Sequence, residues 1–122
     1  EKVIQKASEL GILSKMLVLS NRTDIPELLK CMDVFLFPSL FEGLSVTLVE
    51  AQAAGLRCVI SDKIKPYNIL IDSTVQVSLE SSTKIWCDTI LDVNHKSAVH
   101  YNISDFDMNN VVEHLAKIYK NK

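Results

Sequence analysis

Runs of consecutive apolar residues alternate along this chain with segments whose apolar residues recur every three or four positions. The runs occupy 16–19, 34–37 and 58–60. Because they are continuous rather than alternating, they predict strands that are buried on both faces of a sheet. The intervening periodicity predicts helices at 2–10, 24–32 and 45–54.

The second half of the chain carries a different strand signal. Residues 75–79 alternate between apolar and polar side chains, which predicts an edge strand. Ser81 or Ser82 can cap a helix that runs to about residue 93, and Asp105 or Asp107 can open a last helix to about residue 119.

Helix boundaries also have local signals. Gly11 and Gly55 follow two predicted helices as C-caps. Asp24 and Glu27 have the spacing of a capping box, with Pro26 in the first turn between them.

The order of these elements predicts the fold class. Helices placed between buried strands imply parallel strands joined by right-handed crossovers. We therefore expect a single α/β domain over residues 1–122, with a Rossmann-like parallel sheet of about four strands flanked by helices. A doubly wound unit usually opens with a strand and has about six. Because this chain enters on a helix, we expect the first strand of the unit and its phosphate-binding turn to be absent.

Composition and charge limit the classes of partner that this chain is expected to bind. Thirteen Lys and Arg residues against fifteen Asp and Glu residues give a net charge of −2, which argues against a nucleic-acid partner held by bulk positive charge. Three isolated cysteines, Cys31, Cys58 and Cys87, match no metal or redox spacing, so we expect reduced, buried thiols and a cytoplasmic protein. The histidines lack zinc-binding spacing, and no metal site is expected.

Ligands of such sheets bind beyond the carboxyl ends of the strands. Those ends are 20–23, 38–43, 61–63 and 80–82. The second is the most unusual, because it combines a proline, an acid and a glycine immediately before a helix. The amides at a helix start attract phosphates, and Gly43 lets a ligand approach the backbone closely.

Two carboxylates, Glu42 and Glu50, bracket this cradle of amides. Eight residues of helix rise about 12 Å, too far for the two groups to share a proton. The spacing suits the two ends of one long ligand, and a nucleoside diphosphate sugar carries diols at both ends that carboxylates can bind. A solvated helix residue and an ordinary loop acid remain the alternative, although Glu50 lies in an unusually apolar helix.

The segment from Phe37 to Asp62, FPSLFEGLSVTLVEAQAAGLRCVISD, resembles the signature of retaining family 4 glycosyltransferases of the GT-B fold. Its mark is two glutamates separated by seven residues. The likeness is clear over about 17–63 and is nearest to bacterial capsular, exopolysaccharide or O-antigen enzymes. It implies that this chain is an incomplete carboxy-terminal, nucleotide-sugar-binding domain. The amino-terminal acceptor domain and the first strand are then absent.

The resemblance also implies roles for matching positions. Glu42 is the catalytic candidate and contacts hydroxyls of the transferred sugar, while Glu50 holds the ribose. The loop of Asn21 and Arg22 lies where the family binds the base. The amides expected to face the distal phosphate and the sugar are those of Gly43, Leu44, Ser45 and Val46. Many members have Pro or Gly where Ser45 stands.

The expected function is therefore the donor half of a transferase. It would take a UDP- or GDP-sugar and serve transfer to a glycan or lipid-linked acceptor in cell-surface polysaccharide synthesis. We expect no metal, no other cofactor, no nucleic acid and no turnover from this chain alone. The cytoplasmic protein could also lie at the inner face of the membrane.

Three other functions were weighed against this one. A non-catalytic nucleotide-binding subunit of a split transferase is the main alternative, and an exposed apolar patch would mark the surface for its partner. A flavodoxin-like signalling domain is disfavoured, because 20–23 lacks an acidic cluster. A hydrolase is disfavoured, because its acid pair would converge across one bond at about 5–10 Å.

Overall fold

Three parallel strands form the centre of the molecule. The computed structural model describes residues 2–92 and, beyond them, 107, 109, 110, 112, 113 and 117. Strands β1 (Val34–Phe37), β2 (Arg57–Ser61) and β3 (Thr74–Val77) lie in the order β1-β2-β3. The parallel sheet confirms the predicted α/β class. The helix predicted over about 105–119 falls mostly outside the described residues.

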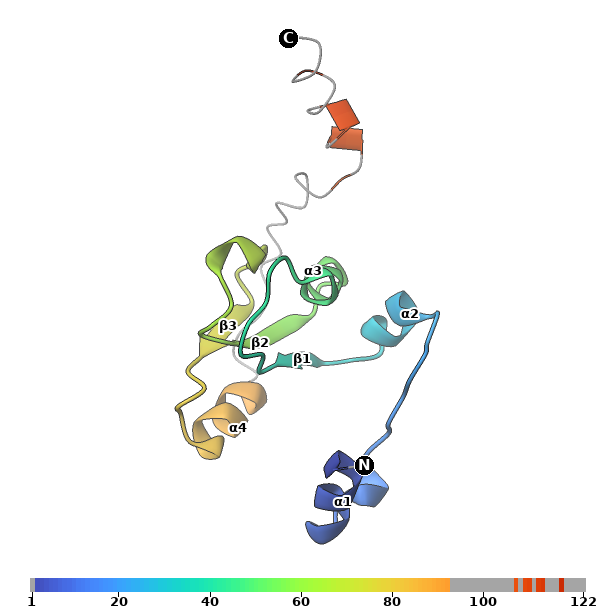
Figure 1. Ribbon diagram of the computed structural model, residues 1–122, viewed down its shortest axis with the longest axis vertical. Helices are drawn as coiled ribbons and strands as arrows, with labels where there is room; N and C mark the ends of the chain where they lie inside the picture. Colours follow the sequence, from blue (N-terminus) through green and yellow to red (C-terminus); the bar gives the residue numbers. More distant parts are fainter. Residues whose placement is uncertain (1, 93–106, 108, 111, 114–116, 118–122) are drawn as a thin grey trace.

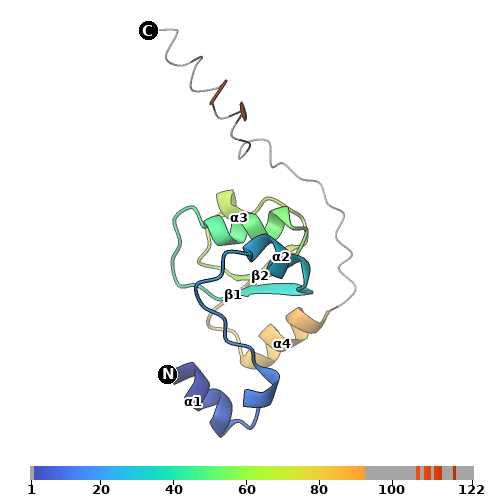
Figure 2. The ribbon, with the colours of Figure 1, turned by 90° about the vertical axis from the view of Figure 1, so that its right-hand side faces the viewer.

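Helices cover both faces of this sheet. Figures 1 and 2 show α3 over one face and α4 over the other. The helices are α1 (Lys2–Glu9), α2 (Ile25–Lys30), α3 (Val46–Ala53) and α4 (Thr83–Leu91), with single 3₁₀ turns η1 (Leu13–Lys15) and η2 (Pro66–Asn68). Strands with helices between them are the predicted Rossmann-like arrangement.

The central strand β2 is buried along its whole length. Cys58 and Ile60 join the core that Leu29 of α2 and Leu48 of α3 complete. On α4, Arg57 donates hydrogen bonds to the carbonyls of Thr89 and Ile90, at 2.6 and 3.1 Å. A cation at the C-terminal end of a helix is favourable, so Arg57 ties the sheet to α4.

Hydroxyl caps and glycines set several helix ends. The Oγ atoms of Ser45 and Ser82 each accept a backbone N–H from the first turn of α3 and α4. Gly11 and Gly55 have φ values of +66° and +80°, as the predicted C-caps require. The capping box at Asp24 is wrong, because its side chain makes no cap hydrogen bond and binds Arg22 instead.

The first predicted strand, at 16–19, is also wrong. This segment is extended but belongs to no sheet, and it links the first helical turns to α2 (Figure 1). Leu17 is 81% exposed and Val18 is 59% exposed. The physical reason is that a strand needs a paired neighbour, and none of the described residues pairs with these.

The cysteines follow the prediction only in part. All three are free thiols, and burial raises the pKa of Cys58 to about 12. Cys31 and Cys87 are exposed, so the prediction of burial is wrong for both. Among the described residues, no helix is long and apolar enough to cross a membrane.

Candidate functional site

The carboxyl ends of the three strands meet at one edge of the sheet, as parallel pairing requires. Residues 38–45, 62–63 and 78–80 leave the sheet there. Figure 2 shows the long loop from β1 into α3 standing clear of the sheet at this edge. We call residues 38–45 the β1–α3 loop.

Glu42 lies half-buried in the β1–α3 loop and is oriented by a neighbour. The Ser39 hydroxyl donates to Glu42 Oε1 over 2.9 Å, and the carbonyl of Phe41 lies 3.2 Å from the same hydroxyl. Among the described residues, Oε2 of Glu42 has no partner. One carboxylate oxygen is thus held while the other is available to a ligand hydroxyl.

The end of the β1–α3 loop is fixed from below by Asn68 of η2. Asn68 Oδ1 accepts the Ser45 N–H over 2.9 Å, and Asn68 Nδ2 donates to the Gly43 carbonyl over 3.0 Å. The Asn68 side chain is fully buried. Both polar ends of one side chain therefore hold backbone groups two residues apart in the loop.

Asn68 is in turn held by the fully buried Gln52 of α3. Gln52 Nε2 donates to the carbonyls of Asn68 and Leu48, at 2.8 and 3.1 Å. Its Oε1 accepts from the Leu70 N–H and the Thr74 hydroxyl, at 2.7 and 3.1 Å. A buried amide with every bond satisfied rigidifies its surroundings, so α3, η2 and β3 are locked under the loop.

Several amides at the start of α3 are left without a partner. Among the described residues, the N–H groups of Gly43, Leu44, Val46 and Thr47 donate no hydrogen bond. A Cβ built on Gly43 meets nothing within 4 Å, so the space beside this backbone is open. Unpaired amides at the positive end of a helix dipole form a site suited to an anion.

Glu50 is exposed on α3, one turn beyond this start. It lines a shallow groove of about 260 Å³ between α2 and α3. The other lining residues are Pro26, Leu29, Lys30, Ala53 and Ala54. Apart from Glu50 and Lys30 the lining side chains are apolar, which suits a flat or ring-shaped ligand group anchored by a carboxylate.

Asn21 and Arg22 lie in the segment that leads into α2, and the hydrogen bonds of the Arg22 side chain stay within that segment. Asn21 has φ +53°, a left-handed conformation that asparagine tolerates. The Arg22 guanidinium makes two hydrogen bonds to the Asp24 carboxylate, one of them 2.7 Å long. This pairing holds the pKa of Asp24 below its ordinary value. Arg22 is therefore already paired within its own loop.

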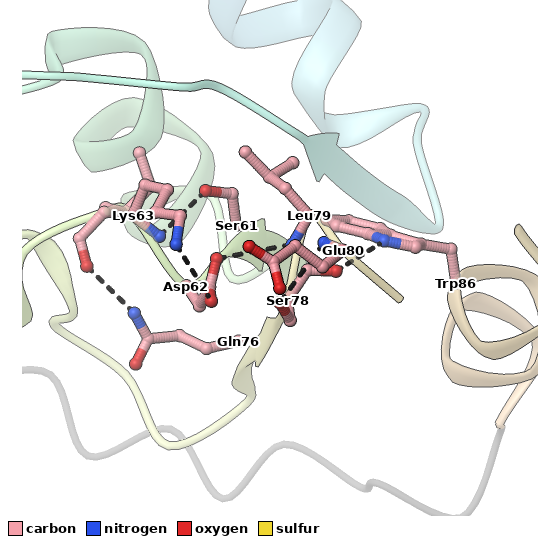
Figure 3. A network of polar contacts seen from close by, with 9 residues as sticks. Ser61, Asp62, Lys63, Gln76, Ser78, Leu79, Glu80 and Trp86 are labelled. Carbon is pink, nitrogen blue, oxygen red and sulfur yellow. Dashed lines mark hydrogen bonds and ion pairs between the residues drawn. The ribbon is translucent and has the colours of Figure 1, made fainter. Parts of the chain in front are cut away.

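The ends of β2 and β3 form a self-contained polar network (Figure 3). Asp62 Oδ1 accepts the Leu79 N–H over 3.3 Å, and Lys63 Nζ lies 3.6 Å from Asp62 Oδ2. Desolvation raises the pKa of Asp62, but the hydrogen bonds from Leu79 and Ser78 and the Lys63 charge outweigh it and leave the pKa lowered. Lys63 thus faces an acid of the protein itself.

A comparison with known proteins decides the family. Residues 1–93 match the family described as Glycosyl transferases group 1. This chain belongs to the group 1 glycosyl transferases. No solved structure matches it. Among the described residues, no group of His, Cys, Asp or Glu side chains could hold a metal ion.

The relatives that this glycosyl transferase chain matches are bacterial proteins named as glycosyltransferases. It is 40% identical over 90 residues to the putative glycosyltransferase EpsF of Bacillus subtilis, covering 73% of this chain and 23% of that protein. It is 32% identical over 128 residues to the capsular polysaccharide biosynthesis glycosyltransferase CapH of Staphylococcus aureus, covering 100% and 35%. It is 26% identical over 122 residues to an Escherichia coli UDP-Gal:alpha-D-GlcNAc-diphosphoundecaprenol alpha-1,3-galactosyltransferase, covering 92% and 31%. The chain thus spans about a quarter to a third of these relatives.

Sequence reasoning missed three residues of the candidate site in this glycosyl transferase chain. Ser39, Gln52 and Asn68 hold the β1–α3 loop, but none of them was a candidate. A signal for Gln52 exists, because residues two apart on a helix face opposite sides. With Glu50 outside, Gln52 must point into the core, where an amide needs partners. Nothing local marks Asn68.

Proposed function

We propose that this chain binds the nucleotide-sugar donor of a retaining glycosyltransferase. The sugar of a UDP- or GDP-linked donor would move to a glycan or lipid-linked acceptor in cell-surface polysaccharide synthesis. The names of the relatives support this, since one includes a UDP-sugar and a diphosphoundecaprenol acceptor and another includes capsular polysaccharide. Such a protein works in the cytoplasm, at the inner face of the membrane where lipid-linked acceptors are reached.

The observation that carries the proposal is the set of unpaired amides between two carboxylates. Gly43, Leu44 and Val46 offer N–H groups to the distal phosphate and the sugar, at the positive end of α3. Glu42 precedes them and Glu50 follows them on the helix. The Ser45 amide serves a different purpose, because Asn68 already accepts it.

The chemistry of this site is positional and electrostatic. The amides stabilise the negative charge that grows on the leaving diphosphate, and they are preorganised by the network beneath them. Glu42, oriented by Ser39, accepts hydrogen bonds from hydroxyls of the sugar and holds its ring in place. Glu50 accepts the ribose hydroxyls, with the groove between α2 and α3 beside it. No step requires a metal ion or another cofactor.

Asn21 and Arg22 are proposed to lie at the base end of the donor. They precede α2, whose Pro26, Leu29 and Lys30 line the same groove as Glu50, so a base would lie beyond the ribose on the side of α2. Since Arg22 is paired with Asp24, a base would meet the edge of an ion pair rather than a lone cation.

The acceptor side is proposed to come from sequence outside this chain, which covers 23 to 35% of its relatives. We therefore expect donor binding without turnover from the 122 residues alone. A nucleotide-binding subunit of a split transferase is the second candidate. The exposed apolar side chains of Val3, Leu17 and Val18 favour it, because they offer a surface for a partner.

Equilibrium binding of UDP, GDP and ADP tests the proposal. We expect one of them to bind with a dissociation constant of about a millimolar. Glu50→Ala should weaken that binding about tenfold, because the ribose hydroxyls lose a charged acceptor. Glu27→Ala is the matched control, since Glu27 is an exposed glutamate of α2. A chain that binds none of the three nucleotides at several millimolar contradicts the proposal.

A further inference from the structure

The side chain of Asn68 hydrogen-bonds to backbone groups of the β1–α3 loop. It lies 25 positions from Gly43 in sequence, and its buried amide bonds the Gly43 carbonyl and the Ser45 N–H. Leu44 stands between these two groups. The two hydrogen bonds therefore fix the orientation of both peptide planes that flank Leu44.

Planar trans peptides determine where the Leu44 groups point. No described peptide is cis, so the N–H and C=O of each peptide point in opposite directions. With the Gly43 carbonyl directed at Asn68, the Leu44 N–H is directed away from it. With the Ser45 N–H directed at Asn68, the Leu44 carbonyl is also directed away. Leu44 is 56% exposed, and the space beside Gly43 is open.

We propose that Asn68 is a positioning residue for the donor: it turns the Leu44 backbone outward, so that the Leu44 N–H donates to a phosphate or sugar oxygen and the Leu44 carbonyl accepts a sugar hydroxyl. This rests on the proposed donor-binding function. The backbone N–H groups of the loop then have two different roles. The Leu44 N–H binds the ligand, whereas the Ser45 N–H is already hydrogen-bonded to Asn68 and does not.

The support under Asn68 suits this role. Gln52 donates to the Asn68 carbonyl and accepts from Leu70, so the η2 turn cannot shift without breaking bonds at both ends of a buried amide. Sites that bind through backbone groups need such support, because a loop amide can otherwise rotate out of line. Rotation of the Gly43–Leu44 peptide would replace the outward N–H with a carbonyl, which repels phosphate.

Hydrogen exchange of the free 122-residue chain gives the first test. The Ser45 amide should be protected and the Leu44 amide should exchange freely. On addition of UDP or GDP, the NMR signal of the Leu44 amide should shift and its hydrogen exchange should become slower. Exchange at Ser45 as fast as at Leu44 in the free chain overturns the inference, whatever the nucleotide does.

Variants of Asn68 give the second test. Asn68→Ala should abolish Ser45 protection and raise the nucleotide dissociation constant at least tenfold, measured at a temperature where far-UV circular dichroism shows the variant folded. Gln76→Ala is the matched control, because it removes an amide side chain that donates to the Ile64 carbonyl and touches nothing in the β1–α3 loop. Its affinity should stay within twofold of wild type.

Asn68→Asp separates positioning from folding. Aspartate still accepts the Ser45 N–H but cannot donate to the Gly43 carbonyl. We expect Ser45 protection to persist while nucleotide affinity falls, a split that a purely structural role would not produce. Wild-type affinity in folded Asn68→Ala or in Asn68→Asp overturns the positioning role alone. Failure of the wild-type chain to bind any nucleotide overturns the proposed function and this inference with it.

Discussion

Two regions at the same edge of the sheet, the turns that follow β2 and β3 and the β1–α3 loop, use their polar groups in opposite ways. In the β2 and β3 turns, the Asp62 carboxylate accepts the Leu79 N–H and pairs with the Lys63 ammonium (Figure 3). In the β1–α3 loop, the anchoring bonds come from Asn68 below, and the amides of Leu44 and Val46 remain unpaired. The turns after β2 and β3 pair their polar groups with each other, whereas the β1–α3 loop leaves backbone N–H groups available to a ligand.

The difference teaches where to look for a binding loop in such a sheet. Both turns carry charged residues, so charge alone does not distinguish them. The first N–H groups of any helix lack partners within the helix, so an exposed set of them that a buried network holds in place is available to a ligand.

Glu42→Gln should have the largest effect. In a protein that carries both the donor and the acceptor side, we expect sugar transfer to fall at least about 100-fold, because glutamine cannot supply the charge that orients the sugar. Nucleotide affinity should change little, since Glu42 meets the sugar rather than the nucleotide. Steady-state kinetics with a nucleotide-sugar donor measure both quantities.

The control for Glu42→Gln is Glu80→Gln, an exposed acid that follows β3 at the same edge. Its transfer rate should match wild type. Transfer by Glu42→Gln within about threefold of wild type would show that the β1–α3 loop does not hold the reacting sugar.

Gly43→Ala should weaken nucleotide binding about tenfold while the fold is unaffected. The added methyl group enters open space, and Gly43 has no positive φ, so the free energy of unfolding should change by less than about 0.5 kcal/mol. The methyl group would instead occupy the room that a ligand needs beside the backbone. Calorimetric binding and chemical denaturation measure the two effects, and unchanged affinity would argue against a close approach at Gly43.

Asp62→Asn should alter acid stability and leave binding unchanged. The pKa of Asp62 is lowered in the folded chain, so its ionised form stabilises the fold above its ordinary pKa and this contribution is lost as the pH falls through the lowered value. The wild-type chain should therefore melt at a higher temperature than the variant at pH 7, and this difference should shrink as the pH falls through the lowered pKa. A loss of nucleotide affinity in Asp62→Asn would remove the contrast between the two turns.

The sequence predicts elements whose signals are local. The runs at 34–37 and 58–60 become β1 and most of β2, and the helix predicted at 45–54 becomes α3 with Ser45 as its cap. The run at 16–19 has the same pattern, but strand formation depends on a neighbour that the pattern cannot reveal. Asp24 fails as a cap for a similar reason, since Arg22 competes for its carboxylate.

The residues of the candidate site also divide into those with a local signal in the sequence and those without one. Glu42, Gly43 and Glu50 lie within nine positions at a predicted strand end and helix start, so the sequence alone predicts a phosphate cradle between two acids. Asn68 reaches the loop from η2, and only the folded chain shows that its amide spans Gly43 and Ser45. Long-range positioning of this kind leaves no periodic signal in a sequence.

The most direct test of donor binding at the β1–α3 loop is a residue-by-residue ¹H–¹⁵N titration of the 122-residue chain with UDP and GDP. We expect one nucleotide to change the chemical shifts of the Leu44, Val46 and Thr47 amides strongly. The chemical shifts of the Asp62, Lys63 and Leu79 amides should stay unchanged. Shifts confined to the β2 and β3 turns, or no shift in the β1–α3 loop at several millimolar nucleotide, would contradict donor binding there.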